Sequence, residues 1–205
     1  MRSLQLSDNA LTGQLPSQLG LLTRMTNCWT QHNHVTGRFP SELGTMRSIE
    51  VLYLMFNQLS GSLPTEICGL VEMTKFDASD NSLITGSLPT QIGRLRSIRT
   101  LRLQSNELTG TVPTQVGMIT YMHWLNLGRN QLSGRIPTEL GLLSSLQYIG
   151  LNHNQLSGSV PSGLEGLPCL TNMEVLGNDL SGYIPDLDTI ALKQSTAELG
   201  CWRPL

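Results

Sequence analysis

Three residues near the N-terminus have the types and spacing of a metal site. Cys28, His32 and His34 follow the pattern Cys-x3-His-x-His, and thiolate and imidazole are ligands that Zn²⁺ prefers. They could hold an ion only if their side chains met at one point. Whether they do depends on the elements that carry them.

Two carboxylates, Asp77 and Asp80, could in principle do general acid–base chemistry as a pair. No partner base and no pocket is implied around them. The chain also lacks a glycine-rich phosphate loop, a nucleophile elbow and a kinase signature. The sequence therefore predicts a protein that is not an enzyme, with no catalytic residues, no cofactor and no metal.

One repeated pattern runs through almost the whole chain. It is clearest from Ile98 to Gly117 and reads L-x-x-L-x-L-x-x-N-x-L-x-G-x-(L/I/V)-P-x-x-(L/I/V)-G-x-L. The repeats begin at Met1, Met25, Ile49, Met73, Ile98, Met122, Leu146 and Leu170. The period is 24 residues, apart from one step of 25 caused by an extra residue near Ile84. A fixed period of this length predicts a solenoid, in which each unit buries its apolar face against its neighbours.

The pattern inside one repeat assigns each position to an element. The L-x-L part alternates like a short strand, so positions 4 and 6 face the core and positions 3 and 5 face outward. The motif (Thr/Ser)-Gly-x-apolar-Pro predicts a second extended segment, and the residues after Pro predict a short helix or 3-10 turn. Cys28 stands at position 4, inside the core, while His32 and His34 lie on the rim and in the next turn. We therefore expect no metal site there.

One asparagine follows the strand in every repeat. Its amide both donates and accepts, so it can satisfy buried backbone groups where the chain turns inward. We interpret this column as a structural ladder. Its members are Asn9, Asn33, Asn57, Asn81, Asn106, Asn130, Asn154 and Asn178.

The Asn column and the L-x-G-x-(I/L/V)-P motif resemble those of the plant-type leucine-rich repeat family. Examples of this family are receptor-like kinase ectodomains, polygalacturonase-inhibiting proteins and algal leucine-rich repeat proteins. The resemblance implies an α/β fold: a right-handed, curved horseshoe with a parallel β-sheet on the concave face and short 3-10 or helical turns on the convex side. We expect eight repeats over residues 1–185 and a degenerate C-terminal cap over 186–205. The first residue already lies at position 1 of a repeat, so we expect further residues before Met1 in the full gene.

Composition excludes some partners. The 205 residues carry a formal net charge of −2 and no long Lys/Arg run, so nucleic acid is not expected. The densest basic cluster, Arg94 to Arg102, is interpreted as solvated charge. The sequence contains no run of 18 apolar residues, so it predicts no membrane span within these residues. The parent protein could still be anchored in a membrane. A disulfide between Cys169 and Cys201 is one pairing that the sequence leaves open.

The variable outward positions must carry any ligand specificity. Aromatic residues make up 5% of the chain, yet they gather at these positions in two groups, with charged residues between them. Exposed aromatic residues often anchor interfaces. The predicted ligand-binding residues are Trp29, His32, Tyr53, Met55, Phe56, Asp77, Arg102, Trp124 and Tyr148.

We therefore predict a recognition module that binds a protein or peptide on its concave face, as part of a receptor or of a secreted defence or signalling protein. The resemblance implies an extracellular or cell-surface location. It leaves open inhibition of a cell-wall-degrading hydrolase, and a glycan remains a second kind of ligand. The regular Thr/Ser column, Thr12 to Ser181, keeps open binding to a polysaccharide or ice surface.

Overall fold

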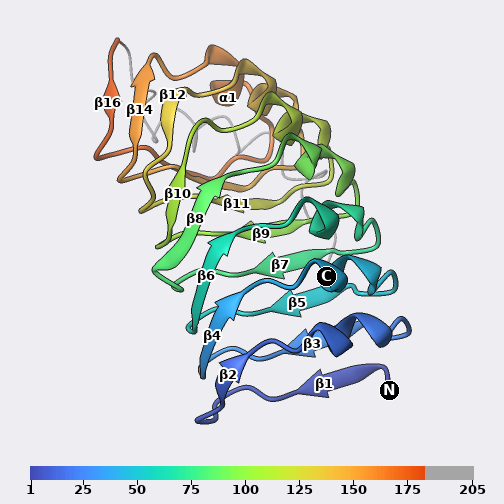
Figure 1. Cartoon of the computed structure of the whole chain (residues 1–205). Helices are drawn as coiled ribbons and strands as arrows, with labels where there is room; N and C mark the ends of the chain where they lie inside the picture. The colour runs from blue at the N-terminus through green and yellow to red at the C-terminus, as the bar shows by residue number, and fades with distance from the viewer. Residues whose placement is uncertain (183–205) are drawn as a thin grey trace.

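A computed structural model describes residues 1–182, and the main sheet is its largest element. Eight three-residue strands pair in parallel, each with the strand of the next repeat. Their register matches equivalent positions, for example Leu4 with Cys28 and Leu125 with Ile149. The strands are β1 (Ser3–Gln5), β3 (Asn27–Trp29), β5 (Val51–Tyr53), β7 (Lys75–Asp77), β9 (Thr100–Arg102), β11 (Trp124–Asn126), β13 (Tyr148–Gly150) and β15 (Asn172–Glu174). Figure 1 shows how they stack along the molecule.

A second layer of parallel strands forms where the Gly-x-apolar-Pro motif predicts extended backbone. The glycine supplies a left-handed turn, as in Gly134 with φ of +79°. Its strands are β2 (Thr12–Gln14), β4 (His34–Arg38), β6 (Gln58–Ser62), β8 (Leu83–Ser87), β10 (Glu107–Thr109), β12 (Ser133–Arg135), β14 (Gln155–Gly158) and β16 (Asp179–Leu180). They form a five-stranded sheet, β10-β8-β6-β4-β2, and a three-stranded sheet, β12-β14-β16. A single bridge, Thr111 to Ser133, joins the two.

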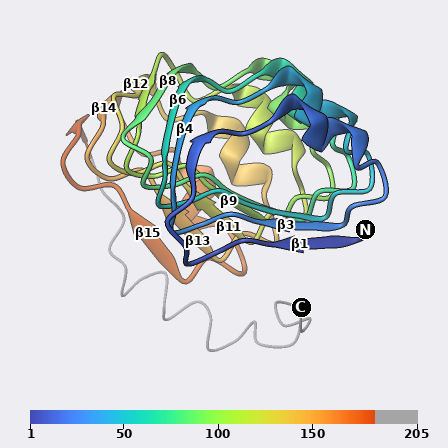
Figure 2. The same cartoon turned by 60° about the horizontal axis from the view of Figure 1, so that its bottom comes forward.

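Short helical turns close each of the first seven repeats. Each begins directly after a proline in the N-cap position whose backbone is extended, such as Pro113 with φ −68° and ψ 137°. Proline has its φ fixed near this value and has no N–H that would need a partner. The 3-10 turns are η1 (Ser17–Leu21), η2 (Ser41–Thr45), η3 (Thr65–Gly69), η4 (Thr90–Arg94), η5 (Thr114–Met118) and η6 (Thr138–Leu142), and repeat 7 has α1 (Ser162–Glu165). In Figure 2 the repeats are coils around a central core, with the main sheet, the second layer of strands and the helical turns on different sides.

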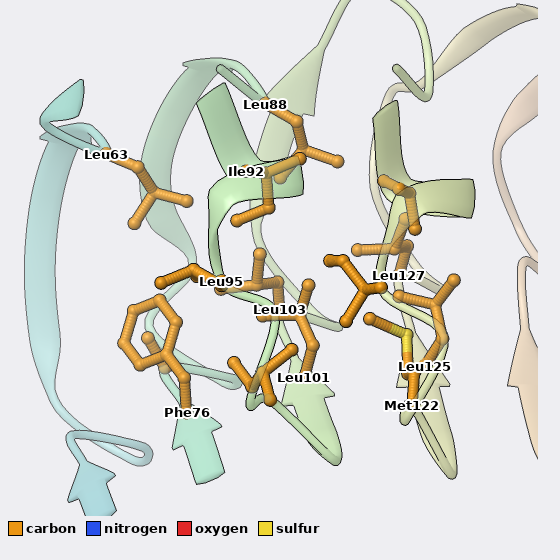
Figure 3. Close-up of a cluster of buried hydrophobic side chains, with 14 of the residues drawn as sticks. Leu63, Phe76, Leu88, Ile92, Leu95, Leu101, Leu103, Met122, Leu125 and Leu127 are labelled. Atoms are coloured by element: carbon orange, nitrogen blue, oxygen red, sulfur yellow. The ribbon is translucent and has the colours of Figure 1, made fainter. Parts of the chain in front are cut away.

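The core consists of apolar columns that run through successive repeats. Phe76, Leu101 and Leu125 occupy position 4 of three neighbouring repeats and are fully buried. Figure 3 shows them with Leu103 and Leu127 of position 6 inside the coil. This is how a solenoid is stabilised: each layer covers the next. The expected fold class, a leucine-rich repeat solenoid with parallel strands and 3-10 turns, is confirmed.

The asparagine side chains link each coil to the previous one. Asn130 donates from Nδ2 to the carbonyls of Leu103 (3.0 Å), Leu127 (3.1 Å) and Gly128 (3.2 Å), and its Oδ1 accepts from the N–H of Leu108 (2.9 Å). The same set of bonds recurs at Asn33, Asn57 and Asn154. Buried backbone groups at the turn thus find partners.

The extra residue in repeat 4 interrupts this ladder once. Asn106 keeps its three donor bonds, but its buried Oδ1 has no hydrogen-bond partner. The missing donor is Ile84, 22 residues earlier, the separation seen in the other repeats. The insertion is absorbed by Ser82, which adopts a left-handed φ of 54°, and by Leu83, which is half exposed.

The expected C-terminal cap, residues 186–205, lies outside the described residues, as do Cys201 and residues 183–185. Cys169 is disulfide-bonded, and whether its partner is Cys201 stays open because Cys201 lies outside the described residues. Within residues 1–182 no helix is long and apolar enough to cross a membrane.

Candidate functional site

The residue at position 8 of each repeat has a left-handed backbone, which sequence reasoning did not anticipate. His32, Phe56, Arg129 and His153 all have φ between 52° and 54°. Non-glycine residues rarely adopt this conformation. The turn after the strand imposes it in every repeat, and side chains at this position therefore line one rim of the concave face. The sequence gives no sign of this shared left-handed conformation, because the residue types at position 8 differ. Only the backbone angles show it.

The first aromatic group, in repeats 2 and 3, presents accessible ring surface. Trp29 and Tyr53 face each other in register on β3 and β5, and both are partly exposed. On the rim, His32 and Phe56 stack with ring centroids 4.5 Å apart and an interplanar angle of 12°. Phe56 is nevertheless 47% exposed, and Met55 beside it is partly exposed. We call these five residues the N-terminal aromatic patch.

A pair of opposite charges, Asp77 and Arg102, lies in the middle of the concave face. Asp77 on β7 accepts hydrogen bonds from the Ser79 N–H (3.0 Å) and hydroxyl (2.7 Å). Its other oxygen lies 3.7 Å from Nη1 of Arg102 on β9. Burial raises the pKa of the Tyr53 phenol; the Arg102 charge acts in the opposite direction and the Asp77 charge adds to the rise. The two charges neutralise each other beside the N-terminal aromatic patch.

The side chains of the second aromatic group, Trp124 and Tyr148, pack against each other and against Arg102. The Arg102 guanidinium carbon lies 4.9 Å from the centroid of the Trp124 ring. Tyr148 stacks on Trp124 with centroids 4.0 Å apart and an interplanar angle of 11°. Arg102 belongs to β9 and Tyr148 to β13, the strands on either side of β11, so Trp124 has neighbours on both sides.

Tyr148 lies flat because its strand ends in a glycine. A Cβ at Gly150 would lie 2.5 Å from Asn126 Oδ1 and 2.8 Å from the Tyr148 hydroxyl. Tyr148 is 7% exposed. Burial, a hydrogen bond with Glu174 and the Glu174 charge raise the pKa of Tyr148 to about 12, against a smaller opposing effect of Arg102.

These contacts correct two sequence expectations. Asp77, at 3% exposure, and Tyr148, at 7%, are buried, so neither is an accessible concave anchor. Trp124 is still partly exposed, although it is packed between Arg102 and Tyr148 and its Nε1 is buried without a hydrogen-bond partner. Periodicity identifies the outward face of a strand, but it does not show that neighbouring side chains will cover one another there.

The residues that resembled a metal site are separated by the fold. Cys28 is 1% exposed in the core, and burial raises its pKa to about 11, so its thiol stays protonated. His32 and His34 are exposed on the rim and at the start of β4. No cluster of three metal-ligating residues occurs within residues 1–182.

Comparisons with known proteins agree with this architecture. The family described as Leucine Rich Repeat matches residues 1–22, 48–70, 121–143 and 145–167. None of the curated proteins matches the sequence. Together with the fold, these repeats identify the chain as a leucine-rich repeat protein of the plant type.

Two solved receptor structures are similar over most of this chain. The plant peptide hormone receptor RGFR1, in complex with RGF2, has a TM-score of 0.89 and 31% identity, covering 93% of this chain and 30% of the receptor. The Arabidopsis receptor kinase HAESA, in complex with the peptide hormone IDA and the co-receptor SERK1, has a TM-score of 0.88 and 30% identity, covering 92% and 32%. The chain thus spans about a third of the length of these receptors.

A plant ice-binding protein shares the fold at lower similarity. Its TM-score is 0.68 and its identity 24%, over 91% of this chain and 67% of that protein. At this identity the likeness concerns the fold alone.

Proposed function

We propose that this chain is a non-catalytic recognition module that binds a peptide, or an extended segment of a protein, on its concave face. The N-terminal aromatic patch is the observation that carries the proposal. It leaves the Trp29 and Tyr53 rings accessible on adjacent strands and Phe56 half exposed on the rim. Aromatic side chains of this kind supply most of the energy at many interfaces.

The chemistry of the patch suits apolar side chains of a ligand. Adjacent strands lie about 4.8 Å apart, so Trp29 and Tyr53 form a continuous apolar strip across two repeats. Met55 beside them can adapt its shape to a ligand. Asn27 and Gln31, two residues before and after Trp29, are partly exposed polar residues.

The similar receptors support this proposal by analogy. RGFR1 and HAESA were solved with peptide hormones, and another match is the ectodomain of a plant membrane receptor kinase from Arabidopsis thaliana. We extend this to a location outside the cell, as part of a longer receptor or of a secreted defence or signalling protein. Inhibition of a cell-wall-degrading hydrolase has no specific support among the described contacts.

The Thr/Ser column gives less support to a polysaccharide or ice surface. Hydroxyls of Thr36, Ser133 and Ser157 donate to the carbonyls of Gly13 (3.2 Å), Gly110 (3.3 Å) and Gly134 (3.4 Å). These hydroxyl protons are used between the coils of the solenoid. A glycan on the aromatic patch instead remains an alternative outcome of the test below.

The test starts from a random peptide library selected on the wild-type chain. Selected peptides are then measured by fluorescence anisotropy against the Trp29→Ala/Tyr53→Ala variant and against Phe56→Ala. The matched control is His153→Ala, which occupies the same repeat position as Phe56 and is equally outside the core. We expect at least a tenfold loss of affinity for the patch variants and less than a twofold change for the control.

Two results would overturn the placement of the peptide site at the N-terminal aromatic patch. Selected peptides could bind the patch variants as tightly as the wild type. Alternatively, an array of plant oligosaccharides could give binding that depends on Trp29 and Tyr53 while the peptide library gives none, which would assign the patch to glycans.

A further inference from the structure

A hollow of about 740 Å³ lies on the opposite, helical side of the solenoid, away from the concave sheet. It spans the turns of repeats 3, 4 and 5. Its lining includes Val71, Glu72, Arg94, Arg96, Gln115 and Met118. Its size lies within the usual range for ligand sites, roughly 300–1,000 Å³.

The packing of the turns changes beside this hollow. In most repeats a glycine lets one turn touch the next: a Cβ at Gly93 would lie 2.7 Å from the Gln115 carbonyl oxygen, and one at Gly44 would lie 2.6 Å from that of Glu66. In repeat 3 this position is Cys68, which is 1% exposed. Its side chain therefore occupies space between η3 and η4 that is closed by direct backbone contact elsewhere.

The hollow carries two cations without counter-ions. Arg94 and Arg96 are exposed, and the one ion pair found within residues 1–182 joins Asp77 to Arg102 instead. With Glu72 as the single acidic residue in the lining, the local charge is positive. A guanidinium matches the two oxygens of a carboxylate, and bidentate pairing is its strongest mode of recognition.

No other repeat combines these features. The residue equivalent to Arg94 is Leu21, Thr45, Gly69, Met118, Leu142 or Gly166 in the other turns. Arg47 is the equivalent of Arg96 in repeat 2, but it has no second arginine two residues before it. The pair is thus specific to repeat 4, where the hollow lies.

Apolar groups flank the charges. Val71 is 49% exposed and Met118 is 53% exposed, and both line the hollow. Aliphatic flanks suit the side chains of a peptide better than a sugar ring, which would favour an aromatic platform, and the lining has none.

We infer that this hollow is a second binding surface, which takes an acidic peptide segment of a partner protein. Carboxylates of the segment pair with Arg94 and Arg96, the Gln115 amide bonds its backbone, and its aliphatic side chains pack on Val71 and Met118. The surface is separate from the concave face, so a ligand and a partner can be bound at the same time.

The test uses a fluorescent, end-blocked peptide of alternating glutamate and leucine, measured by anisotropy against the full chain. Arg94→Gln/Arg96→Gln should weaken binding at least tenfold. The matched control, Arg24→Gln/Arg47→Gln, removes two exposed arginines from the same side of repeats 1 and 2, and should change affinity less than twofold. Circular dichroism verifies that both variants are folded.

Further arms separate the alternatives. Cys68→Gly should weaken binding by closing the gap between η3 and η4, and Trp29→Ala/Tyr53→Ala should leave it unchanged, which keeps this surface distinct from the concave one. Equal losses in the two arginine variants would show general charge attraction and overturn the proposal. A sulfated oligosaccharide that binds more tightly than the peptide, through the same arginine pair, would overturn the class of partner.

Discussion

The N–H of Leu108 donates a 2.9 Å hydrogen bond to Oδ1 of Asn130 and ties repeat 5 to repeat 6. One repeat earlier the equivalent acceptor, Oδ1 of Asn106, is buried and has no partner. Two side chains of the same type, in the same column and with nearly the same exposure, thus differ by one hydrogen bond. This difference can be measured.

We expect Asn130→Ala to cost more stability than Asn106→Ala. Asn130→Ala leaves a buried N–H and several carbonyls without partners, and each unsatisfied buried group costs about 1–3 kcal/mol. Asn106→Ala removes the same donors but also eliminates an acceptor that was already unsatisfied. Urea unfolding followed by circular dichroism should show a difference of about 2 kcal/mol. Equal costs would contradict the assignment of the broken bond.

Deletion of Ser82 provides the complementary variant. It restores the 24-residue period and removes a left-handed non-glycine residue, so Ile84 can reach Asn106 Oδ1. In that background, Asn106→Ala should become as costly as Asn130→Ala. If the cost of Asn106→Ala stays the same, the insertion is not the cause of the interruption.

The Asp77–Arg102 pair should be energetically coupled. Arg102→Gln leaves the Asp77 carboxylate, 3% exposed, with hydrogen bonds from Ser79 alone, and it uncovers one face of Trp124. A double-mutant cycle with Asp77→Asn should give a coupling free energy of about 1 kcal/mol, because the arginine is partly exposed to solvent. Lys75→Gln is the matched control on the same strand as Asp77. Its coupling to Asp77→Asn should be near zero, and a value as large as that of Arg102 would show a general charge effect.

Stability should fall at high pH through Tyr148. Its pKa is raised from 10.0 to about 12, first by burial and then by Glu174, so the folded state favours the neutral phenol. The contribution is complete below pH 10 and is lost as pH rises from about 10 to about 12. Thermal unfolding of the wild type and Tyr148→Phe across this range checks it, because the variant should lose less stability than the wild type.

Gly150→Ala tests the cause of that pKa. The added methyl would collide with the Tyr148 hydroxyl and Asn126, so it should displace the ring and lower the pKa towards 10. Phenolate absorbance, taken as the difference from the Tyr148→Phe variant, reports the titration. An unchanged pKa would mean that Gly150 does not hold Tyr148 in its buried position.

Much of the fold follows from local patterns. Leu101 and Leu103 both point inward because side chains two residues apart lie on the same face of a strand. Gly134 and the proline after it, Pro137, predict a left-handed turn followed by extended backbone. The interior position of Cys28, and hence the absence of convergence with His32 and His34, follows from the same periodicity.

The concave surface was less predictable. The sequence predicts accessible rings for Trp124 and Tyr148, as for Trp29 and Tyr53. In the structure Trp124 is partly exposed, like Trp29 and Tyr53, whereas Tyr148 is buried. Tyr148 differs because of its neighbours across the sheet: its ring stacks on Trp124, and Gly150 leaves room for it to lie flat.

The sequence by itself determined the repeat, the strand faces and the asparagine column, because each depends on residue type at a fixed spacing. The tertiary structure alone decided the left-handed backbone at Phe56, the unpaired Oδ1 of Asn106 and the space at Cys68. Each of these depends on how one coil packs against the next. Such contacts join residues more than twenty positions apart, so local sequence patterns do not predict them.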